Sequence, residues 1–306
     1  MKTLLNSLLK KRYQKRRSPL PKSTSGFTMI ELLVATVVAT IIIVPILTFV
    51  VDLLNRDVKE QAKTNSEQDL QAAVDYITQD MSQAFYVYDE AGVAAITEQL
   101  PYSDNDERTP ILVFWKREFV EDALEPSGGI CSSASCDDTF VQSLVVYYLI
   151  EGDEGIWCQP SGGTCPNRIA RFQIQDGVRD TQRNYVCGAD GRSDCDSSQN
   201  KFRKSQGFNS YDRENPTSWT NSGDYNLNEN NADTLVNYIE DLTLDNVSDS
   251  NDLAQITLIG NALRPTQNDF TCIEDASATP PTYKDSPFCP TASAQVGARS
   301  GFGTSE

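Results

Sequence analysis

The hydrophobic positions form one long uninterrupted run near the N-terminus. Residues 32–51 are twenty residues without a charged side chain. As a helix rising about 1.5 Å per residue, they would span about 30 Å, the thickness of the hydrocarbon core of a bilayer. After Asp52 the apolar residues instead recur at helical spacing: Leu70, Val74, Ile77, Met81 and Ala84. Such a stripe is typical of a helix packed on a sheet, so a helix over residues 27–85 is predicted. Its other face carries Glu67, Asp69, Asp75 and Asp80.

Beyond this helix the pattern changes to that of β-strands. β-branched and aromatic residues are enriched in the segments 111–115, 143–150, 156–158, 168–174, 236–244 and 253–258. A long helix followed by antiparallel strands predicts an α+β fold. Two segments are not expected to pack. Residues 197–232 are polar with isolated aromatics and are interpreted as a surface insertion, and residues 264–306 contain five prolines and are interpreted as a flexible tail.

Charge is distributed unevenly along the chain. The 306 residues include 26 basic and 43 acidic side chains, for a net charge of −17. Residues 1–26 hold eight basic residues and no acid, so the remainder carries −25, which is −17 minus 8. Basic residues ahead of an apolar run place the N-terminus in the cytoplasm and the following residues outside it. A secretory signal peptide is the alternative, but its apolar region is shorter and ends in a small-residue cleavage site. The acid excess disfavours nucleic acid as a partner.

Histidine is absent, which excludes histidine-based catalytic triads and histidine-ligated metal sites. Eight cysteines follow the apolar run as four neighbouring pairs: Cys131/Cys136, Cys158/Cys165, Cys187/Cys195 and Cys272/Cys289. Pairing within neighbours is favoured because each pair would close a short loop, although the sequence cannot fix the connectivity. A zinc site lacks the usual Cys-x-x-Cys spacing, and no cue marks a reactive thiol. Disulfides suit an oxidising compartment.

One polar stretch alternates oxygen ligands in a way that a calcium site would: Asp224, Asn226, Asn228 and Asp233. It is not an EF-hand, because Glu229 stands where glycine is needed and Leu235 where the bidentate glutamate belongs. A solvated loop is the preferred interpretation, as it is for Asp245, Asp249 and Asp252. No metal or cofactor is therefore expected.

Glu31 is the one charge at the start of the apolar run. A carboxylate near lipid is costly unless it is paired, although it could also face the headgroups. The surrounding residues, Gly26-Phe27-Thr28-Met29-Ile30-Glu31-Leu32-Leu33, resemble the processing site of type IV pilins and pseudopilins. The resemblance comprises a basic leader, glycine before the cut, phenylalanine after it and glutamate at the fifth mature position. Pro45 departs from it, falling earlier than the helix-breaking proline of many major pilins.

The resemblance implies that prepilin peptidase cuts between Gly26 and Phe27, that Phe27 is N-methylated, and that Glu31 pairs with the Phe27 ammonium of a neighbouring subunit. It implies a pilin-like fold in which a long N-terminal membrane-spanning helix packs on an antiparallel sheet with disulfide-closed loops. The expected organisation is a leader (1–26, removed), a transmembrane and assembly segment (27–54), an amphipathic helix (55–88), an extracytoplasmic α+β head (89–263) with its insertion (197–232), and a tail (264–306).

The expected function is that of a minor pseudopilin, J- or W-like, because a mature chain of 280 residues is large for a major fibre subunit. Its partners would be prepilin peptidase, other pilins or pseudopilins, the inner-membrane assembly platform and the membrane. It would cross the inner membrane once, with its head in the periplasm or in an extracellular fibre. A minor pilin for adhesion, twitching motility or DNA uptake is the alternative. No motif indicates an enzyme. The general appearance is also similar to cyanobacterial pseudopilins of hormogonium polysaccharide secretion, which implies polysaccharide export for gliding motility.

Overall fold

The chain forms two compact units, Met1–Arg56 and Asp57–Glu306, which are described separately. Helix α2 (Met29–Met81) contributes its first part to one unit and its last part to the other. The computed structural model describes residues 26–102, 107–126, 131, 135–152, 156–159, 165–187, 195, 201–225, 227, 232–246, 253–267, 270–275, 277–278 and 281–297.

In the second unit, α2 buries the apolar stripe that its sequence predicts, with Leu70, Val74, Ile77 and Met81 almost fully inaccessible. The helix ends at Met81, earlier than the predicted residue 85, and Ala84 begins strand β1 (Ala84–Val87). The aromatic and β-branched residues of β1 favour an extended backbone, which pairs with the neighbouring strand instead of continuing the helix.

The second unit is built on a seven-stranded sheet in which every neighbouring pair is antiparallel, in the order β1-β2-β3-β4-β5-β6-β9. Five of its strands lie where the sequence predicts strands: β2 (Arg108–Leu124), β3 (Asp137–Ile150), β4 (Asn167–Gln175), β5 (Asp233–Asn246) and β6 (Leu253–Gly260). The strand predicted at 156–158 is wrong, because Ile156 and Trp157 lie in a turn and Ile156 is 77 % exposed.

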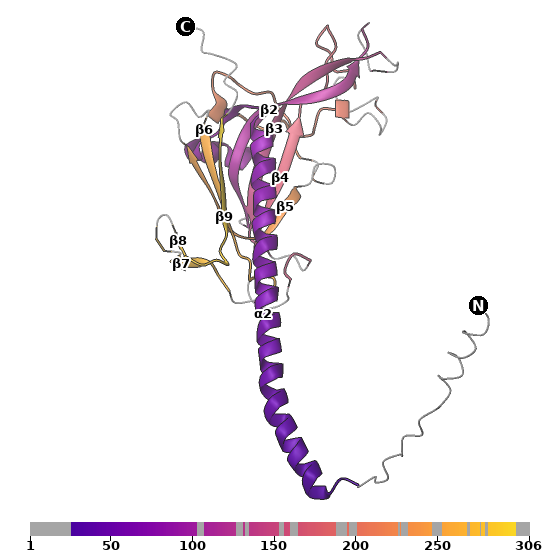
Figure 1. The fold of residues 1–306 in the computed structure, drawn as a ribbon. Helices are drawn as coiled ribbons and strands as arrows, with labels where there is room; N and C mark the ends of the chain where they lie inside the picture. The colour runs from indigo at the N-terminus through magenta and orange to yellow at the C-terminus, as the bar shows by residue number, and fades with distance from the viewer. Residues whose placement is uncertain are drawn as a thin grey trace, which may run out of the picture. The chain divides into compact units, whose positions relative to one another are not determined.

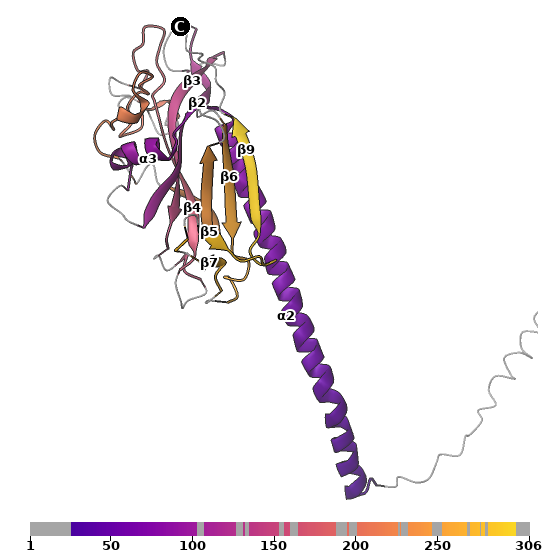
Figure 2. The ribbon, with the colours of Figure 1, turned by 90° about the vertical axis from the view of Figure 1, so that its left-hand side faces the viewer.

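The sheet separates two hydrophobic layers. On one face, α2 packs against residues such as Phe114, Tyr147 and Leu258. Figure 2 shows the other face covered by the short helix α3 (Glu90–Ile96), which is followed by the 3-10 helix η1 (Thr97–Gln99). The predicted α+β class, with a long N-terminal helix on an antiparallel sheet, is therefore confirmed.

The insertion over residues 197–232 packs more closely than its composition suggests. Among its described residues, Phe202, Phe208 and Trp219 are at most 4 % exposed. The Phe208 and Trp219 rings each lie 5.8 Å from the Trp115 ring, centroid to centroid. The 3-10 helix η3 (Pro216–Ser218) also lies in this segment. The expectation of an unpacked insertion is wrong because a few aromatic anchors hold an otherwise polar segment on the sheet.

The expected flexible tail over residues 264–306 is also corrected. Strand β9 (Thr291–Gly297) pairs with β6 along its whole length, from Leu253↔Gly297 to Ile259↔Thr291, and Figure 1 shows it beside β6. Before it, β7 (Ile273–Asp275) and β8 (Thr282–Tyr283) form a two-stranded sheet. The prolines lie outside these strands, so they do not prevent pairing.

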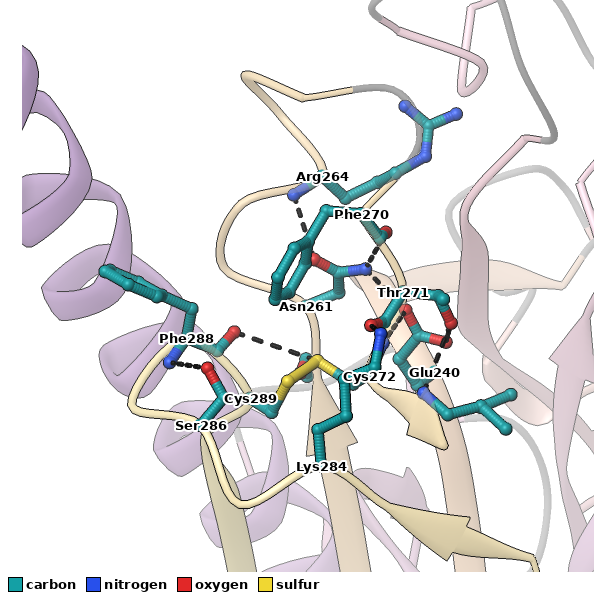
Figure 3. Close-up of a disulfide and its surroundings, with 12 residues drawn as sticks. Glu240, Asn261, Arg264, Phe270, Thr271, Cys272, Lys284, Ser286, Phe288 and Cys289 are labelled. Carbon is teal, nitrogen blue, oxygen red and sulfur yellow. Dashed lines mark hydrogen bonds between the residues drawn. A yellow bond between two sulfur atoms is a disulfide. The ribbon is translucent and has the colours of Figure 1, made fainter. Parts of the chain in front are cut away.

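All eight cysteines form disulfides between sequence neighbours: Cys131–Cys136, Cys158–Cys165, Cys187–Cys195 and Cys272–Cys289. The last of these fixes the segment before β9 (Figure 3). The Cys272 N–H and the Thr271 hydroxyl donate to the two carboxylate oxygens of Glu240 on β5, at 3.2 and 3.3 Å. The disulfide and these hydrogen bonds together hold the C-terminal segment on the sheet.

Removing the Cys272–Cys289 disulfide should cost more stability than removing Cys131–Cys136. The first closes a separation of 17 residues and the second one of 5. Loop-closure entropy then predicts losses of about 3 and about 2 kcal/mol in the free energy of unfolding. The measurement is a denaturant titration of the full chain in detergent, comparing Cys272→Ser/Cys289→Ser with Cys131→Ser/Cys136→Ser. A larger loss for the 131/136 pair would contradict this ranking.

Candidate functional site at the N-terminal end of helix α2

The first turn of α2 is closed by a reciprocal pair of hydrogen bonds between Thr28 and Glu31. The Thr28 carbonyl accepts the first helical hydrogen bond, from the Leu32 N–H at 3.2 Å. The Glu31 N–H donates to Thr28 Oγ1 at 3.3 Å, and the Thr28 N–H donates to Glu31 Oε2 at 3.3 Å. The Thr28 hydroxyl also donates to Glu31 Oε2 at 3.2 Å. This is a capping box: two backbone N–H groups at the helix start, which would otherwise lack a partner, each donate to the side chain of the other residue.

The capping box orients Glu31 but does not neutralise it. Glu31 is the only charged residue between positions 23 and 51, and the next basic residue along the helix is Arg56. At 1.5 Å per residue Arg56 lies about 37 Å further along the axis, which is beyond the reach of an ion pair. In an apolar environment the uncompensated carboxylate costs several kcal/mol. In such an environment, pairing Glu31 would require a cation from outside helix α2.

The rest of α2 in the first unit presents an apolar surface. The described residues of this unit, 26–56, are all exposed, and α2 is long and apolar enough here to cross a membrane. Its threonine hydroxyls donate to helix carbonyls, Thr36 to Leu33 O and Thr40 to Val37 O, both at 2.8 Å. The hydrogen-bonding needs of these hydroxyls are therefore met within the helix, as an environment without water requires.

The two residues at the expected cleavage position lie just before the helix. Gly26 and Phe27 have no regular secondary structure, and the Phe27 side chain is 84 % exposed. No described atom lies within 4 Å of where a β-carbon on Gly26 would stand. The described part of the fold therefore does not require glycine at this position.

Residues 21–47 match the prokaryotic N-terminal methylation motif. This motif supports a type IV pilin-like or pseudopilin-like precursor, the class that prepilin peptidase processes and that assembles with other pilins, and it indicates a structural subunit instead of an enzyme. The motif and the apolar helix together fit a single-pass membrane-anchored protein. No curated protein matches the chain significantly. No solved structure does so either.

A second polar cluster lies within the other unit, where the end of α2 meets the sheet. Asp80, which the sequence places on the helix face opposite the apolar stripe, is only 7 % exposed. Its carboxylate accepts from Lys116 Nζ at 2.7 Å, from Arg171 Nε at 2.7 Å and from the Tyr147 hydroxyl at 2.9 Å. Lys116 also pairs with Glu118 at 2.7 Å, so the four charges cancel. The sequence could not reveal this cluster, because helical spacing does not show which acid meets buried cations.

Burial raises the pKa of Asp80, but the hydrogen bonds and charges of Arg171 and Lys116 outweigh that effect and lower the pKa below its usual range. The carboxylate therefore stays ionised and paired. The Asp80 carboxylate links α2 to the sheet through these hydrogen bonds. Because they occupy both of its oxygens, it is not available as an acid or a base.

The candidate calcium ligands are not brought together as a described site. Asn226 and Asn228 lie outside the described residues, as do Asp249, Asp252 and the side chain of Asp245. Among the residues that are described, no group of three acidic or cysteine side chains could hold a metal ion.

Proposed function

We propose that this chain is the precursor of a minor pilin-like subunit, a pseudopilin, of a type IV pilus or type II secretion-like machine. Prepilin peptidase would cut between Gly26 and Phe27 and methylate the new amino group of Phe27. The subunit would then leave the membrane through the assembly platform and join a fibre by its N-terminal helix. The extracytoplasmic part would carry the disulfide-closed loops.

The observation that carries this proposal is the single carboxylate, Glu31, capped by Thr28 at the start of an otherwise uncharged helix. Cleavage before Phe27 would create an ammonium four residues from Glu31, supplying the cation that the helix lacks. The eight leader bases would be removed by the same cut, so nothing else in the apolar run would carry charge. The fold and the disulfides are consistent with a decorated minor subunit. Polysaccharide export for gliding is a narrower hypothesis, which the neighbouring genes would test.

The test is the N-terminus of the protein purified from the membrane. We expect mass spectrometry to find a mature chain that starts at Phe27 and carries one methyl group on its amino nitrogen. Gly26→Val should leave the full-length precursor, because a branched side chain would crowd the peptidase site. Ser25→Ala is the matched control and should be cut normally. A mature chain starting at any other residue would refute the proposal.

A further inference from the structure

Strands β2 and β3 extend beyond the rest of the sheet as a two-stranded arm, defined as residues 117–124 and 137–142. β1 pairs with β2 only as far as Lys116, and β4 pairs with β3 only from Ser143 onward. Past these points the two strands pair with each other, from Arg117↔Gln142 to Leu124↔Asp137. Figure 1 shows the arm in magenta, reaching past the end of β4.

One face of the arm is packed against the segment that follows β4. Val120, Ala123 and Val141 are buried in a small cluster with Val178, Cys187 and Phe202. Lys201 Nζ donates to the Glu121 carbonyl at 2.8 Å. The disulfides Cys131–Cys136 and Cys187–Cys195 close the adjoining loops. The arm is therefore held in place, and little ordering remains to be done on binding.

The opposite face of the arm exposes an aromatic pair. Phe119 and Phe140 are direct cross-strand partners whose ring centroids lie 5.2 Å apart. Their side chains are 45 % and 61 % exposed, whereas Trp115, four residues before Phe119, is fully buried. A single exposed phenylalanine needs no explanation. Two phenylalanines in tilted ring contact, outside the three hydrophobic clusters of the fold, form an exposed aromatic patch of the kind that is enriched in protein interfaces.

Between this pair and the tip of the arm, four carboxylates are exposed, Glu121, Asp122, Asp137 and Asp138, and on its other side Arg117 is exposed two residues before Phe119. The exposed charge around the pair is therefore mainly negative. The Asp122 N–H donates to Asp138 Oδ1 at 3.0 Å, which links the two strands at the acidic end. Such a border repels nucleic acid and anionic lipid, and it would repel the same face of a second copy. It attracts a basic protein surface.

We propose that the arm docks a protein partner whose contact surface is an apolar pocket bordered by lysine and arginine. Phe119 and Phe140 fill the pocket, and the acidic border steers and orients the partner. This interaction is separate from fibre assembly through α2, because no residue of the arm belongs to the helix. Its failure would leave the proposed function untouched, and the reverse also holds.

The test places the photo-crosslinker p-benzoylphenylalanine at position 140 of the full chain, in the cell that produces it. We expect an ultraviolet-dependent adduct with one protein. Phe119→Ser and Asp137→Lys/Asp138→Lys should each reduce the adduct at least fivefold, and about 0.5 M salt should weaken it in isolated membranes. The crosslinker at Ile156, which is 77 % exposed in the same unit but off the arm, is the matched control and should not give this adduct.

Four outcomes would overturn the proposal. They are the absence of any adduct at position 140, an adduct with a second copy of this chain, an adduct with lipid, and a protein adduct that the charge reversal leaves unchanged. Circular dichroism and protease resistance of each variant check that the fold is retained. If Phe119→Ser fails this check, Phe119→Thr replaces it, because threonine keeps β propensity at the exposed position. If the double charge reversal fails, Asp137→Lys alone replaces it.

Discussion

Asp80→Asn should lower the free energy of unfolding of the second unit by about 3–5 kcal/mol, the range found when one partner of a buried ion pair is removed. The substitution leaves Lys116 and Arg171, 6 % and 16 % exposed in their side chains, and among the described residues the counter-charge that remains paired is Glu118, bound to Lys116. The measurement is a denaturant titration of the full chain in detergent, followed by the fluorescence of the buried Trp115 and Trp219. These residues lie in the layer on the other side of the sheet, so they report on the whole unit.

Asp75→Asn is the control for Asp80. Asp75 is exposed on the same helix and accepts one hydrogen bond from Gln71 at 2.9 Å, so its loss should change stability by about 0.5 kcal/mol or less. Equal effects of the two substitutions would show that the cluster does not fasten the helix.

The acid dependence gives a second check on Asp80. Because the pKa of Asp80 is lowered in the folded state, its contribution is complete above the ordinary value of 3.8 and is lost as the pH falls through the lowered folded pKa. Asp80→Asn should lack this part of the acid destabilisation.

The sequence predicts the architecture well because the fold follows side-chain periodicity. The apolar stripe of Leu70, Val74 and Ile77 is the face that α2 buries, and the strand predicted at 143–150 lies in the interior of the sheet as part of β3. Periodicity fails where a few distant contacts decide the outcome. Asp80 is buried together with its two cationic partners, Lys116 and Arg171. Periodicity cannot predict this burial, because the partners lie 36 and 91 residues away in sequence.

The prediction that the polar segments 197–232 and 264–306 do not pack is wrong for a related reason. Phe208 and Trp219 hold a hydrophilic insertion on the sheet, and β9 gains its stability from pairing with β6, not from its own composition. The sequence analysis does not predict the capping box at Thr28 and Glu31, although a threonine followed three residues later by glutamate is its signature.

Glu31 has two roles that can be separated: its side chain closes the capping box, and its charge is expected to pair with the Phe27 ammonium. The larger functional effect should come from the loss of the charge. Glutamine at this position can still close the capping box with Thr28, but it has no charge to pair with a Phe27 ammonium. Thr28→Val has the reverse effect, because it removes the hydroxyl that caps the helix and keeps the carboxylate. The cap is worth about 1 kcal/mol, whereas a buried unpaired charge costs several.

We therefore expect Glu31→Gln and Glu31→Val to be cut at Gly26 and to insert in the membrane normally, but to enter the fibre at least tenfold less, while Thr28→Val assembles nearly as well as the parent. The measurement is the ratio of subunit in sheared fibres to subunit in the membrane fraction, by quantitative blotting. Valine should favour the membrane itself because it removes a charge from the apolar run. If Glu31→Gln assembles as the parent does and Thr28→Val does not, the carboxylate serves only to cap the helix, and pairing between subunits is wrong for this protein.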